Sequence, residues 1–353
     1  MHHLDAMRGV AALAVCVQHF ADFWMHAAAH AYSPLLSALF LEGMNLGRFG
    51  VVLFFLLSGY LIPISLNEHS GVRTFFIRRL TRLYPAFWVS ALVAVAANFL
   101  YYDTTIALPR FLANLTMVPK FFGQEPVLGM YWTLMMEVIF YLCCAALFVV
   151  HPRALHLKWL SFAVVMGASA ATALPILANH LIGTKLPVQF LSMHLASLFL
   201  GNLIRACGLS DVGSKPLAHP FVLAACAWMI GVIALASGQV WPLASALNPS
   251  GGAGMVMADA VAMALFVLVL RHRSLNWRWL VTCGEWSYSI YLLHWPAIIL
   301  VMVLLPALTF WPHALLALAL TILMARWTYL HVEVPGIQLG RRWSGARAVQ
   351  VLT

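Results

Sequence analysis

Apolar runs long enough to cross a lipid bilayer recur along the whole chain. A bilayer core is about 30 Å thick, and a helix crosses it with roughly 20 apolar residues. Such runs occur at roughly 9–27, 45–66, 84–101, 129–150, 158–178, 188–206, 219–237, 254–270, 284–305 and 313–331. The sequence therefore predicts an all-α membrane bundle of about ten transmembrane helices.

Composition excludes an ordinary soluble domain and argues against a nucleic-acid partner. Hydrophobic residues make up 63% of the 353 residues and charged residues only 9%, whereas about a quarter of a soluble domain is charged. The net charge is +9. Because the basic residues are dispersed at the ends of apolar runs, they fit the positive-inside rule better than a nucleic-acid surface. We expect membrane lipids as partners, and no nucleic acid.

The distribution of basic residues predicts the orientation of the bundle. With the N-terminus inside, the loops on that side hold fifteen of the 20 Lys and Arg residues, the opposite side holds four, and Arg326 lies within the last apolar run. This bias predicts that both termini are cytoplasmic, in a multi-pass protein of the inner (cytoplasmic) membrane. We expect one transmembrane domain over residues 1–340, followed by a cytoplasmic tail at 341–353.

The first apolar segment carries an ionisable pair. Arg8 and His19 are eleven residues apart, so in a helix they share one face, about 16 Å apart along the axis. Titratable residues inside a membrane span usually face a bundle interior or a wet cavity and mark a functional site. The alternative is a signal-anchor helix with a snorkelling Arg8 and an incidental His19.

Two later segments place further polar side chains where lipid is expected. Each set recurs at helical spacing: Thr133, Glu137 and Tyr141 in one segment, and Ser287, Tyr291 and His294 in the other. One such stripe alone favours interhelical hydrogen bonding over chemistry. Three polar stripes in one bundle favour a shared polar cavity.

An arginine cluster lies just before the third apolar run. Arg78 and Arg82 share a helix face, and Arg79 is turned by about 100° from Arg78, so the cluster can surround an anion from more than one side. Guanidinium groups bind phosphate oxygens well, which suggests a clamp for a phosphorylated cytoplasmic ligand. The alternative ligand is an anionic lipid headgroup.

A metal centre is not expected. His26 and His30 have the spacing of ligands on one helix. They have no third ligand or zincin-type carboxylate nearby, so a solvated loop edge is the better interpretation.

At this point the motifs resemble acyltransferase family 3, integral membrane proteins that O-acylate cell-surface carbohydrates and related acceptors. Residues 4–9 (LDAMRG) with His19 resemble the first-helix signature of that family, and 49–62 (FGVVLFFLLSGYLI) its second-helix motif. The family's Arg-Arg-x-x-Arg motif matches 78–82 (RRLTR), and its Trp-Ser-Leu-x-x-Glu segment resembles 132–141 (WTLMMEVIFY). The last two helices match 287–294 (SYSIYLLH) and 332–335 (VEVP). Residues 151–280 carry little signature, and we expect acceptor choice to depend on them.

The resemblance implies a reaction and roles for these residues. A cytoplasmic acyl-CoA, typically acetyl-CoA, would be the co-substrate, with no tightly bound cofactor and a carbohydrate or other hydroxyl acceptor. His19 is the expected general base, and Arg8 would position the donor or stabilise developing negative charge. The remaining roles are CoA phosphate binding by Arg78, Arg79 and Arg82, and acceptor binding by Glu137, Ser287, Tyr291 and His294. Orientation of His19 is the alternative role for Glu137 and His294. A covalent acyl-His19 intermediate is the alternative to direct transfer.

We expect neither a second domain nor a transport function. Some members of the family carry a C-terminal SGNH domain, and we expect none here. The competing class is a transporter that uses buried Arg, His and Glu as a substrate or proton pathway. No inverted repeat or pair of Gly/Pro-broken helices in the sequence supports transport.

Overall fold

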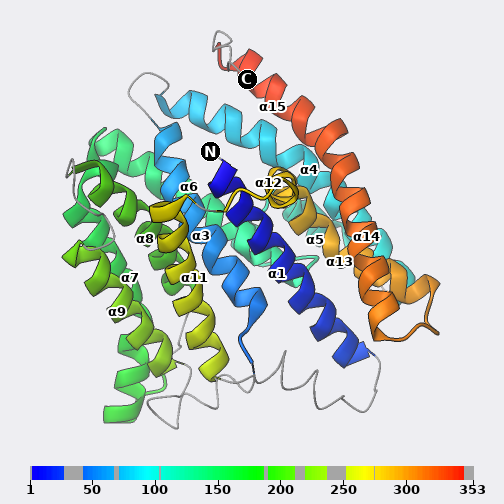
Figure 1. The fold of residues 1–353 in the computed structure, drawn as a ribbon, viewed down its shortest axis with the longest axis horizontal. Helices are drawn as coiled ribbons and strands as arrows, with labels where there is room; N and C mark the ends of the chain where they lie inside the picture. Colours follow the sequence, from blue (N-terminus) through cyan, green and yellow to red (C-terminus); the bar gives the residue numbers. More distant parts are fainter. Residues whose placement is uncertain are drawn as a thin grey trace. The chain divides into compact units, whose positions relative to one another are not determined.

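The structure is a computed structural model that describes residues 2–27, 43–66, 71–102, 105–186, 190–210, 219–236, 252–273 and 275–345. Within these ranges every regular element is a helix (Figure 1). The prediction of an all-α fold is therefore confirmed.

Each of the ten apolar runs overlaps a long helix. These helices are α1 (His2–Ala27), α3 (Leu46–Ser65), α4 (Gly71–Tyr102), α6 (Trp132–Val150), α7 (Lys158–Ile182), α8 (Leu191–Ser210), α9 (Pro220–Ala236), α11 (Gly252–His272), α13 (Ser287–Leu304) and α14 (Phe310–Thr328). In the described part of the chain, 7 helical stretches are long and apolar enough to cross a membrane. The chain is a multi-pass membrane protein, while the count of about ten spans and the cytoplasmic termini stay predictions.

Several boundaries differ from the predicted ones. Helix α4 begins at Gly71 rather than near 84, so the helix predicted for the arginine cluster is continuous with the third apolar run. A separate short helix, α12 (Arg278–Glu285), precedes α13, which begins only at Ser287. After α14 the chain continues through a π-helical turn, η6 (Tyr329–Glu333), into α15 (Val334–Trp343). Hydropathy misses these segments because they are polar or amphipathic.

The chain divides into two compact units. The first comprises residues 1–64 and 139–285, and the second comprises residues 65–138 and 286–353.

Close backbone contacts hold the first unit together. A Cβ atom on Gly59 of α3 would overlap the carbonyl oxygen of Leu198 on α8, and one on Gly201 would overlap that of Leu56. Small residues that let membrane helices approach to backbone contact are a common basis of helix association in lipid. Gly59 lies within the motif at 49–62, and the structure explains it as a packing residue.

The second unit is built around α13. This helix packs against α4 and α14, and α15 packs against α4. Two side-chain hydrogen bonds to backbone carbonyls fix the α4–α13 contact: Tyr288 Oη donates to Leu83 O at 2.9 Å, and Ser90 Oγ donates to Leu292 O at 2.8 Å. In an apolar medium such polar groups need partners, so these bonds restrict how the two helices can slide.

Candidate functional site

Arg8 and His19 lie on one uninterrupted helix. Helix α1 runs from His2 to Ala27 without a break, so the eleven-residue spacing places the two side chains on one face, about 16 Å apart along the axis. His19 is half-buried in the first unit. The helix on which the prediction depends is confirmed.

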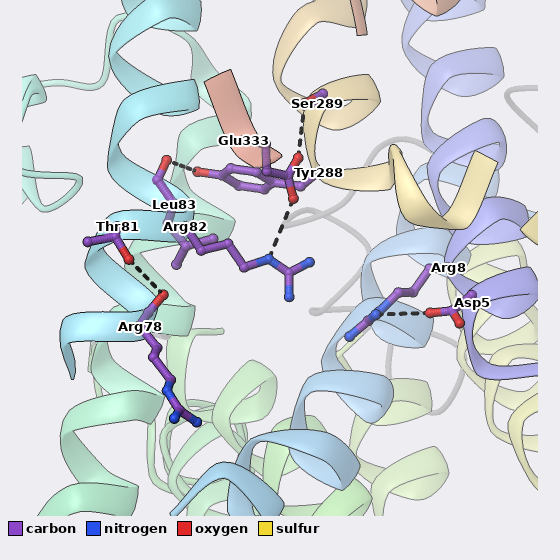
Figure 2. Close-up of polar contacts among 9 residues, drawn as sticks. All are labelled: Asp5, Arg8, Arg78, Thr81, Arg82, Leu83, Tyr288, Ser289 and Glu333. Carbon is purple, nitrogen blue, oxygen red and sulfur yellow. Dashed lines mark hydrogen bonds and ion pairs between the residues drawn. The ribbon is translucent and has the colours of Figure 1, made fainter. Parts of the chain in front are cut away.

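The Arg8 guanidinium has a partner one turn earlier in the same helix. Its Nη1 atom lies 3.3 Å from Asp5 Oδ1, with both side chains about a quarter exposed, at 25% and 29% (Figure 2). A partly exposed pair of this kind contributes only about 0–1 kcal/mol to stability. The pair orients the guanidinium and lowers the net charge at this end of α1.

Helix α12 packs directly on this end of α1. A Cβ atom on Gly9 would overlap Leu280 O, and a Cβ atom on Gly284 would overlap Asp5 O. Burial raises the pKa of the Cys283 thiol on the same helix, so that thiol stays protonated near pH 7. The motif at residues 4–9 thus contains the Asp5–Arg8 ion pair and a glycine, Gly9, that allows α12 to pack closely.

Two further polar side chains, Gln18 and Asp22, lie close to His19 in the sequence. Gln18 Nε2 donates to Asp22 Oδ1 at 2.9 Å, and Gln18 Oε1 accepts from the Leu46 backbone N–H at 3.1 Å. This second bond ties α1 to the start of α3. Sequence reasoning missed both side chains, although Asp22 lies three residues after His19, on the same helix face.

The arginine cluster lies in the second unit, on the first turns of α4. Arg78 is exposed and its Nε donates to Ser344 Oγ at 3.1 Å. Arg79 is half-buried, and its Nη2 donates to Ser65 Oγ at 3.0 Å while its guanidinium lies 5.6 Å from the centre of the Phe75 ring. The three arginines are therefore not equivalent, because Arg79 is held against its own unit.

Arg82 forms an ion pair with a buried carboxylate. Its Nε lies 3.5 Å from Glu333 Oε1, and the side-chain exposures are 32% for Arg82 and 1% for Glu333 (Figure 2). The other carboxylate oxygen, Oε2, accepts a hydrogen bond from Ser289 Oγ at 3.1 Å. Sequence reasoning assigned no role to Glu333 beyond its place in the terminal motif, although a carboxylate in an apolar segment already required a partner.

Two of the predicted polar stripes meet in the second unit. Thr133 Oγ1 and Tyr291 Oη are 2.7 Å apart, and Tyr291 Oη also donates to Met130 O at 2.9 Å. Both side chains are buried. This contact is the interhelical hydrogen bonding that was the alternative explanation for each single stripe.

The other predicted acceptor residues also belong to the second unit. His294 is fully buried, and its Nδ1 lies 2.7 Å from Tyr291 O. Since a carbonyl oxygen only accepts, Nδ1 carries the hydrogen and Nε2 is the basic nitrogen of the neutral ring. Ser287 is buried at the start of α13, and Glu137 is half-buried on α6.

The predicted site thus divides into two groups. Arg8 and His19 belong to the first unit, whereas the arginine cluster, Glu137 and the α13 residues belong to the second. Within the described ranges no group of three or more His, Cys, Asp or Glu side chains could hold a metal ion. His30 and the His26 side chain lie outside the described residues.

Comparison with known proteins gives a consistent set of similarities. A family model described as "Acyltransferase domain" matches residues 1–330. Nodulation protein 10 of Rhizobium leguminosarum bv. viciae is 26% identical over 54% of this chain and 55% of its own length. Peptidoglycan O-acetyltransferase OatA of Listeria monocytogenes is 23% identical over 94% of this chain and 55% of its own length.

A third relative, acyltransferase MdmB of Streptomyces mycarofaciens, is 29% identical over 39% of this chain and 37% of its own length. The chain spans about half the length of the first two relatives. No solved structure matches the chain.

Proposed function

The chain belongs to the acyltransferase family whose domain model it matches over residues 1–330, and from that membership we propose that it moves an acyl group from acyl-CoA to an acceptor hydroxyl. The acyl group is acetyl in the first instance, and the acceptor is a carbohydrate or a related molecule. The observation that carries the donor assignment is the pair of arginines, Arg78 and Arg82, one helical turn apart on α4 and both accessible to solvent.

On the donor side, Arg78 and Arg82 bind phosphates of CoA. Coenzyme A carries several anionic phosphate oxygens at its nucleotide end, and guanidinium groups bind such oxygens with two parallel hydrogen bonds. Arg79 completes the cluster from the neighbouring face. Its contacts with Ser65 and Phe75 suit it to fixing the start of α4 as well as to adding positive charge.

On the catalytic side, His19 acts as the general base. The neutral imidazole takes the proton of the acceptor hydroxyl while that oxygen attacks the thioester carbonyl carbon. The carbon–sulfur bond then breaks, and the CoA thiolate leaves with the proton returned by His19. Arg8 positions the donor or stabilises the oxyanion that forms during attack.

On the acceptor side, we assign contacts to Glu137, Ser287, Tyr291 and His294. Among them, His294 has a defined tautomer, because Nδ1 is held by Tyr291 O. The hydroxyl of Tyr291 is bonded to Met130 O and to Thr133, so its contribution is to shape the site. OatA is a peptidoglycan O-acetyltransferase by name, which makes peptidoglycan one acceptor to test here.

The decisive experiment is thiol release from acetyl-CoA by the purified protein in detergent, with and without candidate acceptors. We expect acceptor-stimulated release of free CoA, together with acetyl ester on the acceptor detected by mass spectrometry. A transporter has no reason to catalyse this reaction. The proposed donor is wrong if CoA does not bind to the protein and if no surface glycan from the host cell stimulates thiol release from acetyl-CoA.

A further inference from the structure

Two arginines of the cluster, Arg78 and Arg82, contact residues of the C-terminal segment. Arg78 contacts Ser344, directly after α15. Arg82 contacts Glu333, at the end of the π-helical turn that precedes α15 (Figure 2). The two contact residues are eleven positions apart, so on a helix they share a face. Glu333 belongs to the terminal motif at 332–335, whereas Ser344 lies beyond every motif found in the sequence.

Between the two contacts the helices touch at backbone distance. A Cβ atom on Gly336 would overlap Thr81 O, and a Cβ atom on Gly340 would overlap Thr81 Oγ1. The two glycines are four residues apart, the small-xxx-small spacing that lets membrane helices pack closely. Thr81 stands between Arg78 and Arg82 in the sequence, so this packing fixes the distance from α15 to both arginines.

Each contact uses the inner nitrogen of the guanidinium. Ser344 Oγ and Glu333 Oε1 face the Nε atoms of Arg78 and Arg82. In Figure 2 the terminal amino groups of Arg82 point away from Glu333. Among the described residues, Glu333 is the one ion-pair partner of Arg82. An anion can therefore bind the terminal amino groups of both arginines while Ser344 and Glu333 stay in contact with the Nε atoms.

The burial of Glu333 gives this contact its significance. A carboxylate that is 1% exposed is costly unless it is paired and hydrogen-bonded. Here Ser289 supplies a hydrogen bond to Oε2, and Arg82 supplies a charge contact with Oε1 at 3.5 Å. The position of the Glu333 carboxylate is set by its own backbone in the π-helical turn and by its hydrogen bond with Ser289 on α13. A fixed carboxylate restricts the directions in which Arg82 can point.

We infer that Glu333 is a positioning residue that orients Arg82 toward the phosphates of the donor, with Ser344 doing the same for Arg78. The inference rests on the proposed function, because it takes the phosphate-bearing ligand from there. It adds that η6 and the end of α15 are part of the donor site.

The test separates donors that carry the nucleotide phosphates from one that lacks them. In Glu333→Gln we expect the KM for acetyl-CoA to rise about tenfold, the cost of about 1.4 kcal/mol of lost orientation. The KM for S-acetylpantetheine, which has no phosphate, and kcat at saturation should stay within about twofold of the unaltered protein. Glu333→Asp should recover part of the loss.

A double variant shows whether Glu333 acts through Arg82. Adding Glu333→Gln to Arg82→Ala should cause no further rise in the KM for acetyl-CoA, because the group being oriented is already gone. The matched control is Gln338→Ala, an exposed position on α15. Equal losses for both donors, or additive effects in the double variant, would show a merely structural role and overturn the inference.

Binding of coenzyme A and of inorganic pyrophosphate distinguishes the two proposals. If the unaltered protein binds both anions but never turns over the thioester, the proposed reaction is wrong, and weaker binding in Glu333→Gln still supports the positioning role. If acetyl-CoA is used and Arg82→Ala weakens it while Glu333→Gln does not, only the inference is wrong. If neither anion binds, both are wrong.

Discussion

Arg48 on α3 and Asp259 on α11 form an ion pair in the interior of the first unit, with Arg48 Nε 2.5 Å from Asp259 Oδ2. The Asp259 side chain is 1% exposed and that of Arg48 14%. Each charge is tolerated there only because the other is present, since an isolated buried ion costs several kcal/mol. The pair joins α3 and α11 through two residues that are 211 positions apart in the sequence.

The first prediction concerns this pair. Asp259→Ala should destabilise the protein by about 3–5 kcal/mol, because it leaves the Arg48 charge buried without a counter-ion. Replacing both residues by apolar ones, Arg48→Met with Asp259→Leu, should recover much of the loss. Unfolding in detergent measures both effects. The control is Glu125→Gln, which removes an exposed pair with Lys120 and should change stability by less than about 1 kcal/mol.

The second prediction concerns the proposed base. His19→Ala should lower the rate of acyl transfer by about 10² to 10⁴-fold while leaving membrane insertion and CoA binding intact. The measurement is acceptor-dependent thiol release from acetyl-CoA. Val17→Ala is the matched control, because Val17 is exposed on the same helix at 40%. Near-normal turnover in a well-folded His19→Ala protein would remove His19 from the mechanism.

The third prediction concerns the arginine cluster. Arg78→Ala and Arg82→Ala should each weaken CoA binding by about tenfold or more, and Lys at either position should restore it only in part, since an ammonium group cannot reproduce the bidentate fork. Binding of radiolabelled CoA in detergent measures this. Arg271→Ala, an exposed arginine of the first unit, serves as control. Unchanged CoA affinity with altered lipid retention would favour the headgroup alternative.

The fourth prediction concerns the contact between α1 and α12. Gly284→Leu should destabilise the protein by about 1–3 kcal/mol or more, because the added side chain must displace the backbone of α1 at Asp5. Thermal unfolding in detergent measures the change. Gly231→Leu on α9 is the control, since a Cβ atom there meets nothing within 4 Å. Equal stability of the two variants would show that the close approach is unimportant.

The sequence predicted the long helices well because hydropathy is a local property. A run of apolar residues such as 287–304 forms a helix whatever its neighbours, since a helix satisfies every backbone hydrogen bond within itself. The shared face of Arg8 and His19 follows from the same regularity. These features needed no knowledge of tertiary contacts.

The remaining features depend on partners far away in the sequence. No local pattern joins Arg82 to Glu333 or Arg48 to Asp259, and each side chain alone is only an unexplained charge. The helix α12 was missed because it is short and amphipathic. One usable signal was overlooked: the four-residue spacing of Gly336 and Gly340 predicts a close helix contact. The partner of that contact, Thr81, could not have been named from it.

The first-helix motif also has a consequence for how the protein is made. Synthesis proceeds from the N-terminus, so α1 enters the membrane long before the ribosome has produced α12. Throughout that interval the surface around Gly9 lacks α12, the helix that packs on it in the folded protein. The Asp5–Arg8 pair is local, however, and forms as soon as the first turns are wound. We therefore expect Asp5 to offset the charge of Arg8 while α1 inserts, before α12 has been synthesised.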